Sequence, residues 1–245
     1  MNMQLTDNIT VKEIVVNFPQ TRAMLETLGI DYCCGGKIPL AQAAENVGLS
    51  TDQVLSNLHQ VLESEESNTT TAQDWNLTSL TELADHIEQT HHVFMKTQLP
   101  RLAGLLDKTL QAHGEKHGDM LRGLQHSLLS LKSDIEMHLA KEEQILFPLI
   151  RQMEAFHAGQ GPTPEMHCGT IGNPIRQMEH EHDAAGQFLV QMRQVSDDYT
   201  LPDDACPTFT ALFEGLEAME KDLHEHIHLE NNILFPKAQI LEEQL

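Results

Sequence analysis

Residues 138–148 read HLAKEEQILFP, and residues 226–236 read HIHLENNILFP. The second segment follows the first by 88 positions, and the match continues upstream along one set of positions. That set is Leu124, Leu128, Leu131, Ile135, His138, Glu142 and Ile145 in the first copy, and Leu212, Leu216, Met219, Leu223, His226, Glu230 and Ile233 in the second. Steps of three and four residues put side chains on one face of an α-helix. The repeat therefore predicts two amphipathic helices, each with one His and one Glu in an apolar stripe.

Each His–Glu pair faces the expected core, where an ionised carboxylate is costly. Such a group costs several kcal/mol unless it is paired or bound to a metal. No Lys or Arg shares either stripe at a neighbouring turn. The buried positions of Glu142 and Glu230 therefore favour a bound multivalent cation. A hydrogen-bonded polar layer inside the bundle is the alternative.

Two further stripes each carry a single histidine. His92 precedes Met95, Leu99, Leu102 and Leu106, and His182 lies within Ile175, Met178, Ala185, Leu189 and Met192. These spacings again mark one helix face. The residues from 77 to 245 are thus a doubled helical hairpin, which predicts an all-α four-helix bundle with a metal site in its core. For these two lone histidines, an ordinary hydrogen-bonded core role stays open.

The helix boundaries follow from capping and breaking residues. Ser79 and Glu82 fit a capping box at the first helix, and Pro100 is expected to kink or interrupt it. The second helix is expected from about 119 to 156. The third is expected to open with Asn173 as N-cap and Pro174 at the first helical position. The fourth is expected from about 207 to 243.

A polar segment divides the chain. Residues 63–76 read ESEESNTTTAQDWN, a Ser- and Thr-rich stretch without a helical stripe. We therefore expect a small helical domain at 1–62, a linker at 63–76 and the bundle at 77–245.

Composition limits the partners. The 245 residues include 37 Asp and Glu against 15 Lys and Arg, a formal charge of −22, which disfavours nucleic acid and anionic membranes. Apolar runs are too short to span a bilayer, and the first residues lack the pattern of a secretion signal. The four cysteines do not form a disulfide framework. These features predict a soluble, cytoplasmic protein.

The six predicted metal ligands are His92, His138, Glu142, His182, His226 and Glu230. Six donors exceed the need of one tetrahedral zinc. They suit two iron ions, each bound by two histidines and bridged by both carboxylates, although manganese accepts the same donors. With an oxo or hydroxo bridge, each iron would keep one position open for a small ligand.

Other titratable residues near these stripes are less suitable as metal ligands. His91 lies about 100° from His92 around the helix and off its apolar line. Residues 224–228 read HEHIH and match HExxH, but His224 and His228 lie about 200° from His226, so a zinc hydrolase is disfavoured. Asp85 and Glu88 are expected either to accept hydrogen bonds from ligand imidazoles or to form a solvated helix end.

The chain resembles the RIC (repair of iron centres) family, the hemerythrin-like YtfE, ScdA and DnrN group. The resemblance rests on DYCCGGK at 31–37, KEEQILFP from Lys141, MEHEHD from Met178 and LENNILFP from Leu229. It implies a di-iron protein, often a homodimer, that acts on iron–sulfur proteins damaged by nitric oxide or oxidants. It would supply labile iron or handle nitric oxide. The implied ligands are the six residues that the stripes select.

Cys33 and Cys34 are the candidates for redox or iron-transfer chemistry in the small domain. Adjacent cysteines form only a strained, readily reduced disulfide, which favours switching over stapling. They could also contact a damaged cluster protein, and a tight turn with two incidental thiols is the alternative. Cys168 and Cys206 stand alone and receive no role.

The sequence is compatible with three functions. The first is an iron-handling repair protein without enzymatic turnover. The second is a di-iron enzyme that reduces nitric oxide or activates dioxygen. The third is a hemerythrin-like carrier of a small ligand, which is disfavoured because it gives the cysteine-bearing domain no purpose.

Overall fold

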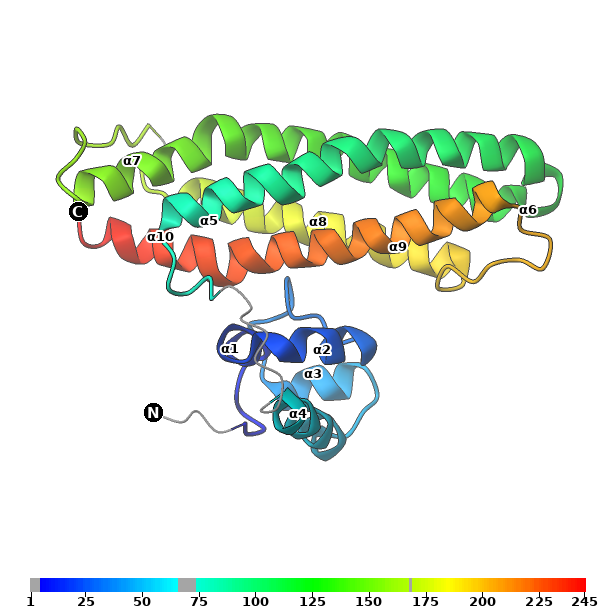
Figure 1. Ribbon diagram of the computed structural model, residues 1–245, viewed down its shortest axis with the longest axis horizontal. Coiled ribbons are helices and arrows are strands. Elements are labelled where there is room, and N and C mark those ends of the chain that lie inside the picture. Colours follow the sequence, from blue (N-terminus) through cyan, green and yellow to red (C-terminus); the bar gives the residue numbers. More distant parts are fainter. Residues whose placement is uncertain (1–4, 66–73, 168) are drawn as a thin grey trace. The chain divides into compact units, whose positions relative to one another are not determined.

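The computed structural model describes residues 5–65, 74–167 and 169–245 (Figure 1). The regular elements in these ranges are helices, apart from one isolated bridge between Thr10 and Pro39. The all-α prediction is therefore confirmed. Of the predicted linker, residues 66–73 lie outside the described ranges. None of the helices in the described ranges combines the length and the hydropathy that a membrane-spanning helix requires.

The N-terminal helices are short and enclose a small apolar core. They are α1 (Val11–Asn17), the 3₁₀ turn η1 (Pro19–Thr21), α2 (Arg22–Thr27), α3 (Leu40–Asn46) and α4 (Thr51–Glu65). Helix α1 begins with a capping box, in which the Thr10 hydroxyl accepts from the Glu13 N–H at 3.2 Å. Ile14, Leu25 and Leu58 are fully buried. Helix α3 contributes Leu40 to the same core. Each of the helices α1, α2, α3 and α4 thus buries an apolar side chain, and this burial stabilises the unit.

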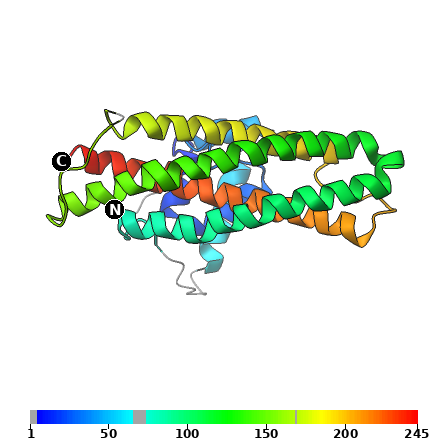
Figure 2. The same ribbon diagram turned by 90° about the horizontal axis from the view of Figure 1, so that it is seen from above.

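The remaining helices form the bundle. They are α5 (Leu80–Ile87), η2 (Glu88–His92), α6 (Val93–Lys141), η3 (Glu142–Leu146), α7 (Phe147–His157), α8 (Gly172–Ser196), α9 (Pro207–His228), η4 (Leu229–Leu234) and α10 (Phe235–Glu242). Elements η2, η3 and η4 are π-helical turns within otherwise α-helical rods. Figures 1 and 2 show these rods side by side along one axis, with successive rods running in opposite directions.

Most predicted boundaries are close to those observed. The capping box of Ser79 and Glu82 is present, and the fourth rod begins at Pro207. Helix α8 begins at Gly172, so Asn173 and Pro174 lie inside its first turn and Asn173 is not the N-cap. Pro at this position costs little, because the first N–H groups of a helix have no intrahelical partner.

The expected break at Pro100 is wrong. Helix α6 runs through Pro100, and its backbone departs from helical angles at His117 (φ −116°, ψ 19°), where the first rod turns into the second. Proline removes one backbone hydrogen bond. Leu99 and Leu102 on either side are buried, and this packing holds the helix together.

The apolar stripes face the core as predicted, with one exception. Ile145 is 52% exposed, whereas Leu146 is 1% exposed. The π-turn η3 begins at Glu142 and adds a residue to the turn, which shifts every later side chain around the helix axis. The α-helical spacing that relates His138 to Glu142 therefore does not extend to Ile145.

Candidate metal centre

Every rod of the bundle contributes to one buried polar cluster. His92 ends η2, His138 lies in the last turn of α6, and Glu142 begins η3. His182 lies in the middle of α8, His226 lies near the end of α9, and Glu230 lies in η4. The structure thus brings together all six residues that the sequence selects.

The six side chains form two overlapping groups suited to a cation. One group is His92, His226, Glu142 and Glu230, and the other is His138, His182, Glu142 and Glu230. Within each group the candidate ligand atoms all lie within 4.8 Å of one another. Both carboxylates belong to both groups, and each group has its own pair of histidines. This is the arrangement expected of two cations that share two carboxylate bridges.

The candidate ligand atoms lie close together, and the two carboxylates are shielded from solvent. Nε2 of His92 lies 3.4 Å from Oε2 of Glu142, and Nε2 of His138 lies 3.3 Å from Oε1 of the same carboxylate. Glu142 and Glu230 are both 0% exposed. Burying two carboxylates costs several kcal/mol each without compensating charge, so the donor chemistry fits a divalent or trivalent cation.

The π-turns coincide with the cluster. His92, Glu142 and Glu230 all lie within π-helical residues. A π-turn inserts one extra residue into an α-helix and is found frequently at functional sites. Here the turns set the angle at which three of the six side chains leave their helices.

Glu143 holds His92 from the outer side. The Nδ1–H of His92 donates to Oε1 of Glu143 at 2.8 Å, and Lys96 Nζ donates to Oε2 at 2.8 Å. Partial burial would raise the pKa of Glu143, but the hydrogen bonds from Lys96 and His92 outweigh it and lower that pKa. With Nδ1 as donor, Nε2 of His92 presents its lone pair to the cluster.

Glu181 does the same for His138. The Nδ1–H of His138 donates to Oε2 of Glu181 at 2.9 Å, and Lys141 forms a second hydrogen bond with that carboxylate. The hydrogen bond from His138 is the main reason that the pKa of Glu181 falls to about 2. Each group of the cluster therefore contains one histidine that is oriented by a Glu–Lys pair.

The sequence did not single out Glu143 and Glu181 for this role. It offered Asp85 and Glu88 either as acceptors for ligand imidazoles or as a solvated helix end. Both carboxylates bind Nη2 of Arg151, at 2.6 and 2.8 Å. The sequence signal for this role was that Glu143 and Glu181 each stand next to a predicted ligand in the chain. Such a position alone does not say which helix the side chain will reach.

His91 is buried but belongs to neither group. Its Nδ1–H donates to Asp222 at 3.0 Å, and its ring stacks on His226 with centroids 5.6 Å apart. It is therefore a packing neighbour of a candidate ligand, in agreement with its position off the His92 stripe.

The two histidines that define the HExxH match, His224 and His228, also lie outside both groups. Asn232 Nδ2 donates to Nδ1 of His228 at 2.9 Å, and burial lowers the pKa of His228 to about 3. Neither His224 nor His228 belongs to a metal-suited group of the described residues. This arrangement agrees with the view that the match is accidental.

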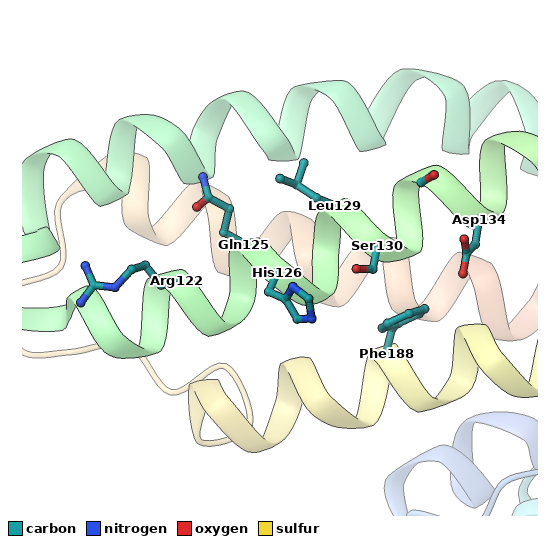
Figure 3. Close-up of a pocket in the computed structure, with 8 residues that line it drawn as sticks. Arg122, Gln125, His126, Leu129, Ser130, Asp134 and Phe188 are labelled. Atoms are coloured by element: carbon teal, nitrogen blue, oxygen red, sulfur yellow. The ribbon is translucent and has the colours of Figure 1, made fainter.

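A surface pocket between α6 and α8 lies away from the cluster (Figure 3). Its lining residues are Arg122, Gln125, His126, Leu129, Ser130, Ser133, Asp134 and Phe188. None of them is among the six predicted ligands. Figure 3 shows His126 of α6 and Phe188 of α8 in the space between these two helices.

The cysteines differ in environment. Cys33 is buried and Cys34 is half-buried, and a hydrogen bond with Cys34 together with burial raises the pKa of the Cys33 thiol. A hydrogen bond with His113 lowers the pKa of Cys206 to about 7. Cys168 lies outside the described residues.

Comparison with known proteins agrees with both parts of this description. Residues 83–238 match the family model described as Hemerythrin HHE cation binding domain, and residues 7–62 match ScdA_N, described as Domain of Unknown function (DUF542). The chain is similar to iron-sulfur cluster repair protein YtfE of Dickeya chrysanthemi (strain Ech1591), with 38% identity over 226 residues. The same protein of Enterobacter sp. (strain 638) is 37% identical, and that of Salmonella newport (strain SL254) is 36% identical.

Each of these alignments covers 92% of this chain and 94% of the relative. The match therefore includes both the N-terminal part and the bundle. The chain belongs to the family of the iron-sulfur cluster repair proteins YtfE, and its bundle belongs to the hemerythrin HHE cation-binding family.

Proposed function

We propose that the bundle binds two iron ions through His92, His138, Glu142, His182, His226 and Glu230. The observation that carries this proposal is the sharing of both carboxylates by two histidine pairs. A carboxylate between two cations offsets the repulsion between them, and imidazole with carboxylate suits iron. A single tetrahedral zinc would use only part of this donor set.

The function that we propose for the chain is repair of damaged iron–sulfur clusters, with labile iron as its contribution. The relatives aligned over 92% of the chain carry the name iron-sulfur cluster repair protein. The proposed division into 1–62, 63–76 and 77–245 is supported by family matches at 7–62 and 83–238. Iron–sulfur proteins are then the clients.

The donor count supports release of iron. Each group offers two imidazoles and two shared carboxylates, fewer protein ligands than an ion of octahedral preference accepts. When bound, the irons would supply exchangeable metal and open positions for a small ligand such as nitric oxide or dioxygen. The burial of the six side chains keeps water out of the site. Glu143 and Glu181 orient His92 and His138 so that their imidazole lone pairs face inward.

The test is transfer of iron to an acceptor. Iron-loaded protein is mixed without oxygen with the cluster-free form of a [4Fe–4S] dehydratase, sulfide and a thiol reductant. Cluster absorbance and dehydratase activity should recover, while Glu142→Ala prepared in the same way should be ineffective because it carries less iron. Recovery no better than with iron-free protein would contradict the proposal. Sustained reduction of nitric oxide without loss of iron would assign the site to an enzyme.

A further inference from the structure

A second group of metal-binding side chains lies in the N-terminal helical unit. Candidate ligand atoms of Asp31, Cys33 and Cys34 all lie within 4.8 Å of one another. None of these residues is among the six in the bundle. The loop that carries them follows α2 and leads through Gly35 and Gly36 to α3.

Asp31 fixes the conformation of this loop. Its Oδ1 accepts hydrogen bonds from the backbone N–H of Cys33 at 2.9 Å and of Cys34 at 3.0 Å. Its Oδ2 accepts from the N–H of Gly35 at 2.9 Å. Three backbone bonds to one carboxylate keep the loop wound around it, so the two thiols are held in place before any ligand arrives.

The two sulfur atoms are spaced for one tetrahedral cation. Sγ of Cys33 lies 3.8 Å from Sγ of Cys34 and 3.3 Å from Oδ1 of Asp31. Two thiolates bound at about 2.3 Å to a tetrahedral ion are about 3.8 Å apart. A disulfide would need about 2.0 Å between the sulfurs. The loop therefore has the sulfur spacing of a metal chelate.

Glycine keeps the carboxylate side of the group open. A Cβ at Gly35 would lie 3.1 Å from Oδ2 of Asp31, closer than most side chains tolerate. A Cβ at Gly36 would lie 2.6 Å from the carbonyl oxygen of Tyr32. Gly36 permits the tight turn, and Gly35 leaves room beside the Asp31 carboxylate.

We propose that Cys33, Cys34 and Asp31 bind one divalent cation of the iron-to-zinc series. Each thiol gives its proton to solvent as its metal–sulfur bond forms, and the ligand charge of −3 then faces the +2 charge of the ion. Three protein ligands leave one tetrahedral position open. Asp31 is exposed and Cys34 is half-buried, so the ion exchanges with solvent or with an acceptor. This site does not depend on iron in the bundle.

The test uses Co²⁺ as the probe, because thiolate–cobalt bonds absorb in the near ultraviolet and nitrogen or oxygen ligands do not produce that band. Iron-loaded, fully reduced protein is titrated with Co²⁺ without oxygen. The wild type should develop the thiolate band with saturation at one Co²⁺ per chain. The matched pair of variants is Cys33→Ser/Cys34→Ser, which should lose the band, and Cys168→Ser/Cys206→Ser, which should keep it.

Two further variants separate ligand loss from misfolding. Cys34→Ser alters only the half-buried thiol and should abolish saturable binding while the bundle keeps its iron and the circular dichroism is unchanged. Asp31→Asn should weaken Co²⁺ binding at least about tenfold. Absence of the band in the wild type, or its persistence in Cys33→Ser/Cys34→Ser, would overturn the proposal. If the wild type develops the cobalt band but its bundle holds no iron, only the proposed di-iron function is refuted.

Discussion

The Nδ1 atom of His138 lies 2.9 Å from Oε2 of Glu181, so the side chain next to one predicted ligand in sequence orients another on a different helix. His138 belongs to α6 and Glu181 to α8. The hydrogen bond fixes the ring and the tautomer of His138, and it increases the basicity of the nitrogen that faces the cluster.

Replacement of Glu181 should therefore weaken iron binding without removing a ligand. We expect Glu181→Ala to lower iron affinity by roughly 10- to 100-fold. Competition with a chromogenic ferrous chelator measures this affinity. The control is Glu136→Ala, because Glu136 is exposed on α6 and pairs with Lys132 at 2.7 Å. Equal affinities for the two variants would show that Glu181 does not support the site.

The packing of α6 against α9 makes a prediction about two glycines. A Cβ at Gly104 would meet nothing within 4 Å, whereas a Cβ at Gly215 would lie 2.6 Å from Cδ2 of Leu102. Gly104→Ala should raise the free energy of unfolding by up to about 1 kcal/mol through helix propensity. Gly215→Ala should gain the same helix propensity, but overpacking should lower the free energy of unfolding by about 1–3 kcal/mol.

Urea unfolding of the iron-loaded proteins measures the difference. Gly104→Ala should be more stable than the wild type, and Gly215→Ala should be no more stable than the wild type. Equal stabilisation by both replacements would mean that α6 and α9 are not in close contact at Leu102.

Cys206 should be reactive near neutral pH. The hydrogen bond with His113 lowers the pKa of the Cys206 thiol to about 7. Its thiolate form, which is the nucleophile, is therefore abundant at pH 7.5. Iodoacetamide alkylation of the Cys206 peptide, followed by mass spectrometry across pH, should show a midpoint near this value.

Removal of the imidazole tests the cause. His113→Gln should move the alkylation midpoint upward, towards the ordinary thiol value of 9.0. His126→Gln serves as the control, because His126 lines the pocket between α6 and α8. A wild-type midpoint near 9 would contradict the described environment of Cys206.

The sequence predicts the bundle and the cluster well because both depend on helical periodicity. The offset that relates His138 and Glu142 to His226 and Glu230 places four of the six side chains, and the apolar stripes place His92 and His182. All six are buried in the structure. Periodicity within each helix is thus enough to place these six side chains in the core.

Departures from α-helical geometry and contacts between helices were not predictable in this way. The exposed Ile145 results from a π-turn, for which α-helical spacing gives no signal. The partners of His92 and His138 depend on the rotation of one rod against the next. For the same reason, the contact of Asp85 with Arg151 could not be predicted from the sequence.

The most direct test of the central claim is metal analysis of protein purified after growth with sufficient iron, together with its absorption spectrum. We predict about two irons per chain and the charge-transfer bands of a bridged ferric pair. Glu142→Ala and Glu230→Ala should each lower the iron content, because each carboxylate belongs to both groups. Near-full zinc loading, or iron content unchanged in both variants, would contradict a di-iron centre built on these two residues.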